Sequence, residues 1–316
     1  MTDAIYADEY DLFSLSTPMF KITKPIRLIE LFAGIGSQAK ALQNLGADFV
    51  RWKAVEFDKY ALRSYNAIHG TDFEVSDIRD IHATDLEITD TDKFCYIMTY
   101  SFPCQDLSIA GQMKGMQKGS STRSGLLWEV ERILDECEVL PQVLLMENVP
   151  QVIGKKNLKD FQSWRSKLEK LGYSNFVQLL NAKDYGVPQN RNRCFMVSIL
   201  GNYSYQFPVK QQLKVKLKDL LEDNVDEKYF ISDVALKGLL AKNKRDKEKG
   251  NGFRFEPLDR ERERESKSVT TRTGRSTETY IFEPNRGGQR NRNRLNSNGK
   301  GLQGDRQSND ECGEYP

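Results

Sequence analysis

Histidine and cysteine are scarce and scattered in this 316-residue chain. His69 and His82 are its two histidines, and no CxxC pair occurs among its five cysteines. Structural zinc sites use closely spaced Cys and His ligands, so we expect no metal site. Cys95, Cys137 and Cys194 fit buried thiols that stay reduced.

Long apolar runs are absent as well. No stretch of about 18 apolar residues occurs, which argues against a membrane-spanning helix. The first twenty residues carry acids but neither a basic start nor an apolar centre, so we expect no signal peptide. These absences predict a cytoplasmic protein, and the length allows one large domain with a smaller partner.

Charge is unevenly distributed along the chain. Residues 241–316 hold 18 Lys and Arg against 13 Asp and Glu, a net +5, so the net charge of +2 leaves −3 for the rest. A basic region beside a weakly acidic body fits a protein that binds a phosphate backbone. A solvated surface would have the same composition, so charge alone leaves nucleic-acid binding open.

Apolar segments alternate with helical patterns from about residue 24 to 205. The expected strands are 26–33, a segment ending near Glu56, a short one followed by a turn in FEVSDIRDI, 94–103, 142–149, 175–180 and 194–200. The expected helices are 37–45, 58–68, 125–137 and 158–171. This alternation predicts an α/β fold with a doubly wound, mainly parallel sheet that helices cover on both faces.

The composition changes after Pro208. Between 284 and 316 the only aliphatic side chains are Leu295 and Leu302, too few to build a core. We therefore expect four parts: an extension over 1–24, the α/β domain over 25–207, part of a small second domain over 208–283, and a poorly ordered tail over 284–316.

A glycine turn, FAGIGSQA, follows the first expected strand and leads into a helix. Its Gly34 and Gly36 would let a ligand approach the backbone, and Glu56, twenty residues past Gly36, could accept hydrogen bonds from a ribose. The same pattern fits an NAD dehydrogenase, a methyltransferase or a purely structural turn.

A cysteine, Cys104 of SFPCQDLS, lies at the carboxyl end of an apolar strand, where α/β sheets bind their ligands. Lys114, Lys118 and Arg123 could favour its thiolate, although an inert strand-end cysteine is the plain alternative. The segment 106–124, rich in Gly, Ser, Lys and Gln, is expected to be a mobile loop.

Two further motifs follow in the chain. MENVP ends a strand with Glu147, and QNRNRCF places Gln189, Arg191 and Arg193 at alternate positions, which in an extended segment point to one face. Alone, the first would usually be a strand end and the second a solvated basic run.

The order of these motifs resembles the cytosine-5 DNA methyltransferase family of bacterial or phage type over residues 27–200. TYSFPCQDLS, KGSSTRSGLLWEVERIL and LLMENV are similar to mollicute CpG methyltransferases. The resemblance implies a Rossmann-like methyltransferase domain, S-adenosylmethionine as cofactor, double-stranded DNA as substrate, a target recognition region after residue 208, and a setting in a restriction-modification or phage system.

The resemblance also assigns roles to residues. It places the cofactor against Phe32, Ala33, Gly34, Ile35, Gly36, Glu56, Phe57, Asp77, Ile78 and Pro103. It implies that Cys104 attacks C6 of a flipped-out cytosine, that Glu147 binds the N3/N4 edge and that Arg193 binds O2. Arg191 would help to hold the substrate and the catalytic loop. The implied DNA contacts are Gln105, Lys114, Lys118, Arg123, Gln189, Arg272 and Arg275.

The sequence departs from the family's pattern after the recognition region. Family members continue with a further segment and end in a Gly-Asn-Ser motif, neither of which is found here. We therefore expect a recognition region cut short and a complementary polypeptide that supplies the missing motifs. The alternatives are an inactive DNA- or cofactor-binding remnant, an RNA-directed methyltransferase of the same architecture, and the NAD dehydrogenase, which leaves the later motifs without a purpose.

Overall fold

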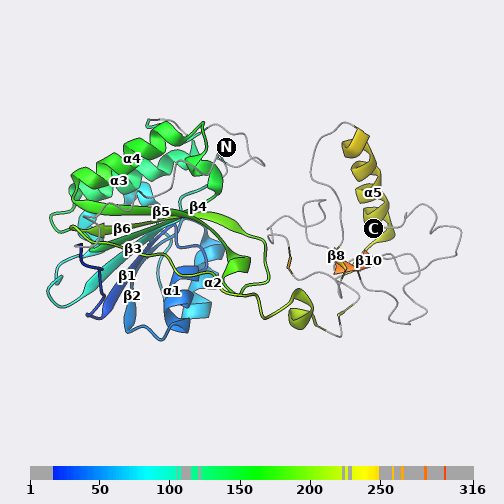
Figure 1. Cartoon of the computed structure of the whole chain (residues 1–316), viewed down its shortest axis with the longest axis horizontal. Helices are drawn as coiled ribbons and strands as arrows, with labels where there is room; N and C mark the ends of the chain where they lie inside the picture. The colour runs from blue at the N-terminus through cyan, green and yellow to red at the C-terminus, as the bar shows by residue number, and fades with distance from the viewer. Residues whose placement is uncertain are drawn as a thin grey trace, which may run out of the picture. The chain divides into compact units, whose positions relative to one another are not determined.

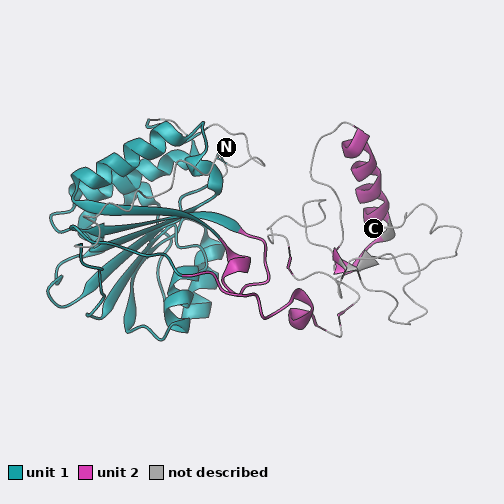
Figure 2. Ribbon diagram, viewed as in Figure 1, with its two compact units in different colours: residues 1–180, 192–208 teal, residues 181–191, 209–316 magenta. Residues whose placement is uncertain are grey.

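The computed structural model divides the chain into two compact units, residues Met1–Leu180 with Asn192–Pro208 and residues Asn181–Arg191 with Val209–Pro316 (Figure 2). The structure describes residues 17–104, 106–107, 115–119, 122–222, 225–226, 230–248, 258–259, 265–266, 281–282 and 295–296. The first unit contains the sheet. The second begins after Pro208 and also takes in the segment between the last two strands of that sheet.

A six-stranded sheet forms the centre of the first unit (Figure 1). Its strands are β1 (Ile26–Leu31), β2 (Phe49–Val55), β3 (Cys95–Tyr100), β4 (Val143–Asn148), β5 (Tyr173–Asn181) and β6 (Asn192–Leu200). Their order is β2-β1-β3-β4-β6-β5. The pairs β1–β2, β1–β3 and β3–β4 are parallel, whereas β6 is antiparallel to β4. The predicted α/β fold with a mainly parallel sheet is confirmed.

Helices cover both faces of this sheet, with α1 (Ser37–Asn44) and α2 (Lys59–His69) on one side and α3 (Leu127–Glu136) and α4 (Leu158–Lys170) on the other (Figure 1). The mainly apolar sequence of β3 is explained by the layers that pack on its two faces. Cys95 and Ile97 belong to the core cluster that contains Ala39 of α1, while Tyr96 and Met98 belong to the cluster that contains residues of α3 and α4. Both faces of the strand are therefore buried.

Helix α2 begins and ends where local chemistry requires. The Asp58 carboxylate accepts hydrogen bonds from the backbone N–H groups of Tyr60 and Ala61, at 2.8 and 3.1 Å. Gly70, with φ of 65°, ends the helix in a left-handed conformation that suits glycine. The chain thus turns directly from the end of β2 into α2, which keeps Glu56 at the sheet edge.

The turn expected in FEVSDIRDI is present as a 3-10 turn, η2 (Ile78–Asp80). The short strand expected before it is wrong, because that extended stretch has no strand pairing. One backbone hydrogen bond joins this extended stretch to the chain just after β2, from the Ser76 N–H to the Glu56 carbonyl at 3.1 Å. The Asp77 carboxylate then accepts the N–H of Arg79 at 3.0 Å. This cap turns the chain before a ladder forms.

The second unit contains the helix α5 (Asp233–Glu248) and four two-residue strands, β7 (Phe230–Ile231), β8 (Leu258–Asp259), β9 (Ile281–Phe282) and β10 (Leu295–Asn296). β7 pairs with β10 and β8 with β9. Leu236 and Leu239 of α5 form a small buried cluster. Apart from β8, β9, β10 and residues 265–266, the chain from 249 to 316 lies outside the described residues, and this includes most of the expected tail 284–316.

No helix in the described ranges combines the length and apolar character that crossing a membrane requires. Within the same ranges, no three His, Cys, Asp or Glu side chains gather closely enough to hold a metal ion.

Candidate functional site

A cavity of about 650 Å³ opens in the first unit, at the edge of the sheet where the parallel strands end. Six of the ten predicted cofactor residues line it: Phe32, Glu56, Phe57, Asp77, Ile78 and Pro103. They come from four separate chain segments, which the parallel topology brings to one edge. A second cavity, of about 590 Å³, has Phe20, Lys24 and Gln142 in its lining and carries none of the predicted site residues.

The glycine turn forms one wall of this cavity. Phe32 has φ of 58°, which is unusual for a bulky residue, and Gly34 and Gly36 have φ of 58° and 80°. The Glu56 carboxylate accepts the N–H of Gly34 at 2.8 Å and that of Asp58 at 2.7 Å. Two backbone donors therefore hold the Glu56 side chain in place, half-buried, at the end of β2.

The other predicted turn residues, Ala33, Gly34, Ile35 and Gly36, make the turn itself. Beneath it lies a buried carboxyl group, that of Glu30, which accepts the N–H of Ala39 at 3.2 Å and the hydroxyl of Tyr65 at 2.5 Å. Burial raises the pKa of Glu30, while these hydrogen bonds act in the opposite direction. The first turn of α1 is thereby tied to β1 and α2.

Asp77 and Ile78 form a second wall. The Asp77 carboxylate accepts Nε of Arg79 at 2.9 Å, and this side-chain hydrogen bond is the main reason that the pKa of Asp77 lies below its usual value. Asp77 is thus ionised at neutral pH. Ile78, 3% exposed, belongs to the main core cluster, so the wall is anchored from behind.

The turn that carries Cys104 follows β3 and is fixed by three hydrogen bonds. The amide of Asn148, 2% exposed, donates to the Phe102 carbonyl at 3.0 Å, and the Ser124 hydroxyl donates to the Pro103 carbonyl at 2.6 Å. The N–H of Leu107 donates to the Cys104 carbonyl at 3.0 Å. The Cys104 side chain itself is half-buried against the core.

The other described cysteines are poor nucleophiles. Burial raises the pKa of Cys95 and of Cys137 to about 11 each, and that of Cys194 to about 12. A thiol with so high a pKa supplies almost no thiolate at neutral pH. Among the described cysteines, Cys104 is therefore the candidate for chemistry.

Glu147 and Arg193 are brought together across β4 and β6. The antiparallel register places Glu147 opposite Phe195, two residues past Arg193. Arg193 Nε lies 3.0 Å from Glu147 Oε1, and the two side chains are 19% and 23% exposed. Because β4 also neighbours β3 in the sheet, this pair belongs to the same edge as Cys104.

The three alternating side chains of QNRNR do not share one strand. Arg193 lies in β6, but Gln189 and Arg191 precede that strand, and Gln189 instead forms a bridge with Ser266. The N–H of Arg191 donates to Asn181 Oδ1 at 3.0 Å, which holds this segment as a loop of the second unit. The alternation therefore does not place all three side chains on one strand face.

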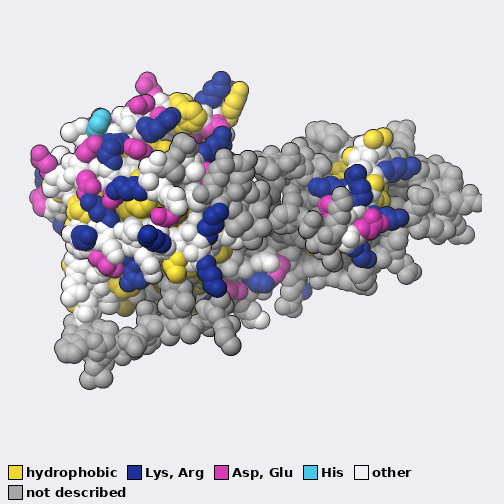
Figure 3. Space-filling model, turned by 90° about the horizontal axis from the view of Figure 1, so that it is seen from above, with side chains coloured by type: hydrophobic (Ala, Val, Ile, Leu, Met, Phe, Trp, Pro, Cys, Tyr) yellow, Lys and Arg dark blue, Asp and Glu magenta, His cyan; other side chains and the backbone are white. Residues whose placement is uncertain are grey.

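The structure places three of the seven expected DNA contacts, Lys118, Arg123 and Gln189. Lys118 Nζ lies 2.5 Å from Glu131 and 5.3 Å from the centre of the Trp128 ring, while Arg123 lines the cavity. Gln105, Lys114, Arg272 and Arg275 lie outside the described residues. On the face shown in Figure 3, the described side chains of the first unit mix Lys and Arg with Asp and Glu.

The described ends of the segment 106–124 are anchored. Leu107 and Met116 are 1% and 0% exposed within the main core cluster. The N–H of Gly115 donates to the Asp106 carbonyl at 3.1 Å, and the Asp106 carboxylate accepts the N–H of Arg123 at 2.8 Å. The mobile loop expected here stays a prediction for 108–114 and 120–121, which lie outside the described residues.

Sequence reasoning missed several residues of this site. Ser76, Ser101, Thr122 and Leu126 line the cavity, and Asn148, Ser124 and Asp106 hold the turn of Cys104. Asn148 could have been found, because an amide inside a buried strand end needs a partner. The cavity residues carry no comparable signal, since their position depends on how the loops pack.

Comparison with known proteins gives a consistent result. The family model of the C-5 cytosine-specific DNA methylase matches residues 26–310. The chain is 36% identical over 258 residues to the Type II methyltransferase M2.ScrFI of Lactococcus lactis subsp. cremoris, covering 66% of this chain and 71% of that protein. It is 42% identical over 204 residues to the orphan methyltransferase M.SssI of Spiroplasma monobiae, covering 63% and 50%.

Solved structures agree in fold. The Entamoeba histolytica methyltransferase EhMeth has a TM-score of 0.62 at 19% identity, over 78% of this chain and 71% of that one. The S. pombe Dnmt2 methyltransferase has a TM-score of 0.59 at 21% identity, over 77% and 70%. None of these matches supports the complementary polypeptide expected from the sequence.

Proposed function

This chain belongs to the C-5 cytosine-specific DNA methylase family, and from that premise we propose that it transfers a methyl group from S-adenosylmethionine to C5 of a cytosine flipped out of duplex DNA. One observation carries the proposal. The anchored turn of Cys104 lies at the same sheet edge as the Glu147–Arg193 pair, and its Pro103 lines the cavity. Relatives named as Type II methyltransferases make a restriction-modification setting the natural one, and the inactive-remnant alternative is not favoured.

The cavity fits the proposed cofactor. Phe32 and Phe57 offer aromatic faces to an adenine ring, Glu56 an oriented carboxylate to a ribose diol, and Asp77 with Ile78 an anchored wall for the adenine edge. S-adenosylmethionine, when bound, supplies an electrophilic methyl group on a positively charged sulfur. Phe32 and Glu56 directly follow strands β1 and β2, and Ile78 is buried in the core.

Cys104 supplies the nucleophile in this proposal. Its thiolate adds to C6 of the cytosine and forms a sulfur–carbon bond, which makes C5 nucleophilic enough to take the methyl group. A base then removes the C5 proton, the C5–C6 double bond forms again, and the thiolate leaves. The three hydrogen bonds around Phe102, Pro103 and Cys104 keep the turn from moving during both steps.

Glu147 and Arg193 bind the cytosine in this proposal. Addition of the thiolate leaves negative charge on the ring, which a hydrogen bond or proton from Glu147 at N3 and a donor from Arg193 at O2 relieve. The Glu147–Arg193 contact at 3.0 Å fixes each side chain before the base arrives. We propose that Arg191 helps to hold the substrate and the loop after Cys104.

Methylation of nucleic acid tests the proposed function. The protein is incubated with tritiated S-adenosylmethionine and either duplex DNA or tRNA, and labelled 5-methylcytosine is counted after hydrolysis. The proposal expects label in DNA and none above background in tRNA. Label in tRNA alone would identify an RNA methyltransferase, and binding of NAD instead of S-adenosylmethionine in calorimetry would overturn the proposal.

Glu56→Gln is expected to weaken S-adenosylmethionine binding by about tenfold, because the neutral amide replaces one oriented carboxylate oxygen with a donor. The dissociation constant is measured by isothermal titration calorimetry. Glu74→Gln, an exposed acid elsewhere on the first unit, is the matched control and should change nothing. Equal affinities for both variants would remove Glu56 from the cofactor site.

A further inference from the structure

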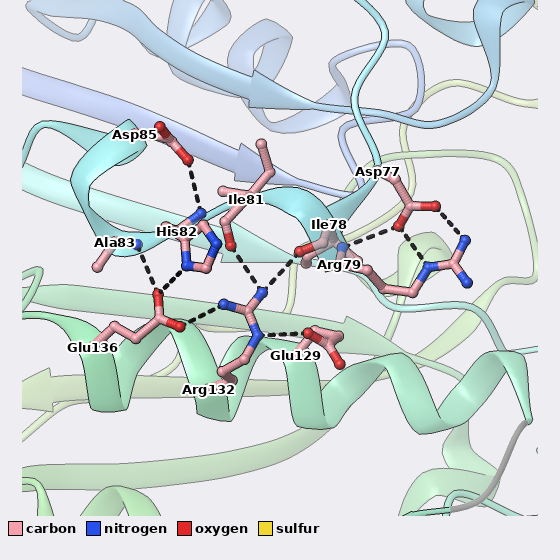
Figure 4. A network of polar contacts seen from close by, with 10 residues as sticks. All are labelled: Asp77, Ile78, Arg79, Ile81, His82, Ala83, Asp85, Glu129, Arg132 and Glu136. Carbon is pink, nitrogen blue, oxygen red and sulfur yellow. Dashed lines mark hydrogen bonds and ion pairs between the residues drawn. The ribbon is translucent and has the colours of Figure 1, made fainter.

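A polar network joins helix α3 to residues 78–83, next to the cavity wall that Asp77, Ile78 and Arg79 form (Figure 4). Its centre is Arg132 of α3. Nε lies 2.7 Å from Glu129 and Nη1 lies 2.7 Å from Glu136, both on the same helix. Nη2 donates to the carbonyls of Ile78 and Ile81 at 3.1 and 2.8 Å. One guanidinium group therefore connects α3 to both ends of the η2 turn.

The second carboxylate oxygen of Glu136 extends this connection. Oε2 accepts the N–H of Ala83 at 3.1 Å and lies 3.1 Å from Nδ1 of His82. The hydrogen bond from Arg132 is the main reason that the pKa of Glu136 lies below its usual value, so the carboxylate is charged at neutral pH. Arg132 therefore holds Ile78 and Ile81, and Glu136 holds His82 and Ala83.

Both segments that this network joins reach the cavity. Asp77, Ile78 and Arg79 line it from the η2 side, and Thr122, Arg123 and Leu126 line it from the turn that precedes α3. The same turn also holds Pro103, which precedes Cys104, because the Ser124 hydroxyl donates a hydrogen bond to the Pro103 carbonyl. The spacing of these two walls therefore depends on how α3 is held against residues 78–81.

We infer that Arg132 is a positioning residue for the cofactor, setting the distance between the η2 wall and the wall formed by residues 122–126. The inference rests on the proposed function, because it takes S-adenosylmethionine as the ligand of this cavity. The inference goes beyond the proposed function because it assigns a role to Arg132, a side chain that does not line the cavity. A planar guanidinium suits this role, because its donors can reach two carboxylates and two carbonyls at once.

Arg132→Gln tests the inference. We expect the dissociation constant for S-adenosylmethionine to rise about tenfold, since the η2 wall loses two hydrogen bonds. At saturating cofactor, kcat should stay within about threefold, because no reacting group changes. Hydrogen exchange should accelerate selectively at residues 78–83. Arg132→Lys keeps the positive charge but loses the planar guanidinium with its several N–H donors, and should not restore the affinity.

Arg165→Gln is the matched control, because Arg165 pairs with Glu169 on α4 at 3.1 Å and both side chains are about half exposed. It should leave affinity and exchange at 78–83 unchanged. If Arg132→Gln does not fold, Glu136→Gln decides, with an expected threefold loss of affinity.

The outcomes distinguish a failure of the inference about Arg132 from a failure of the proposed function. Folded Arg132→Gln or Glu136→Gln protein with wild-type affinity would overturn the inference, as would full rescue by Arg132→Lys. Wild-type protein that binds no S-adenosylmethionine would instead contradict the proposed function itself.

Discussion

Cys104→Ser should reduce methyl transfer to duplex DNA by at least about 10³-fold while leaving S-adenosylmethionine binding within about twofold. A serine hydroxyl is a far weaker nucleophile than a thiolate at neutral pH, so addition to C6 would become rate-limiting. The change is nearly isosteric, and the hydrogen bonds that fix this turn come from Asn148, Ser124 and Leu107, not from the thiol. Steady-state kinetics and calorimetry measure the two effects.

The control for this prediction is Cys137→Ser. Cys137 is also half-buried, but burial raises its pKa to about 11 and it lies at the end of α3. Its replacement should leave turnover within about threefold. Retention of most activity in Cys104→Ser, with loss in another cysteine variant, would move the nucleophile elsewhere.

Gly36→Ala should destabilise the first unit and weaken cofactor binding on the order of 100-fold, because small displacements of a binding turn have large effects. Gly36 has φ of 80°, where alanine is strained by about 1–2 kcal/mol. The added methyl group would also lie 2.6 Å from Cε2 of Tyr65 and 2.7 Å from Cδ2 of His69. Crowding of this kind costs about 1–3 kcal/mol more.

Gly46→Ala isolates the steric part of this effect. Gly46 has φ of 67°, so alanine is strained there too, but a methyl group would meet nothing within 4 Å. Urea denaturation should show that Gly36→Ala lowers the free energy of unfolding by about 1–3 kcal/mol more than Gly46→Ala. Equal losses would show that His69 and Tyr65 yield and that the turn tolerates a side chain.

The parts of the site that sequence could predict are those set by strand ends. The segments before Phe32, Glu56, Cys104 and Glu147 each predict a strand of a mainly parallel sheet, and parallel strands bring their carboxyl ends to one edge. The cavity-lining residues that were predicted follow from this rule together with the family resemblance. The pairing of Glu147 with Arg193 was not predicted as a contact, because the antiparallel return of β6 fixes it.

Other features depend on tertiary packing that periodicity does not reveal. The Asp77 carboxylate caps η2, and Arg132 holds that turn from a helix more than fifty residues away. Lys118 is an expected DNA contact, and its ammonium lies beside Glu131, a pairing that the sequence did not indicate. Gln189, Arg191 and Arg193 alternate in sequence, but the first two precede β6. There the N–H of Arg191 donates to Asn181, and the backbone on either side of Gln189 pairs with Ser266.

Covalent trapping would show whether the Cys104 thiolate adds to the cytosine ring. Duplex DNA in which 5-fluorocytosine replaces cytosine is incubated with the protein and S-adenosylmethionine, and the complex is separated under denaturing conditions and digested for mass spectrometry. Fluorine cannot leave C5 as a proton does, so the sulfur–carbon bond at C6 should persist. The account predicts one adduct, on the peptide that contains Cys104, and none with Cys104→Ser. A methylating protein that forms no adduct, or an adduct on another residue, would contradict it.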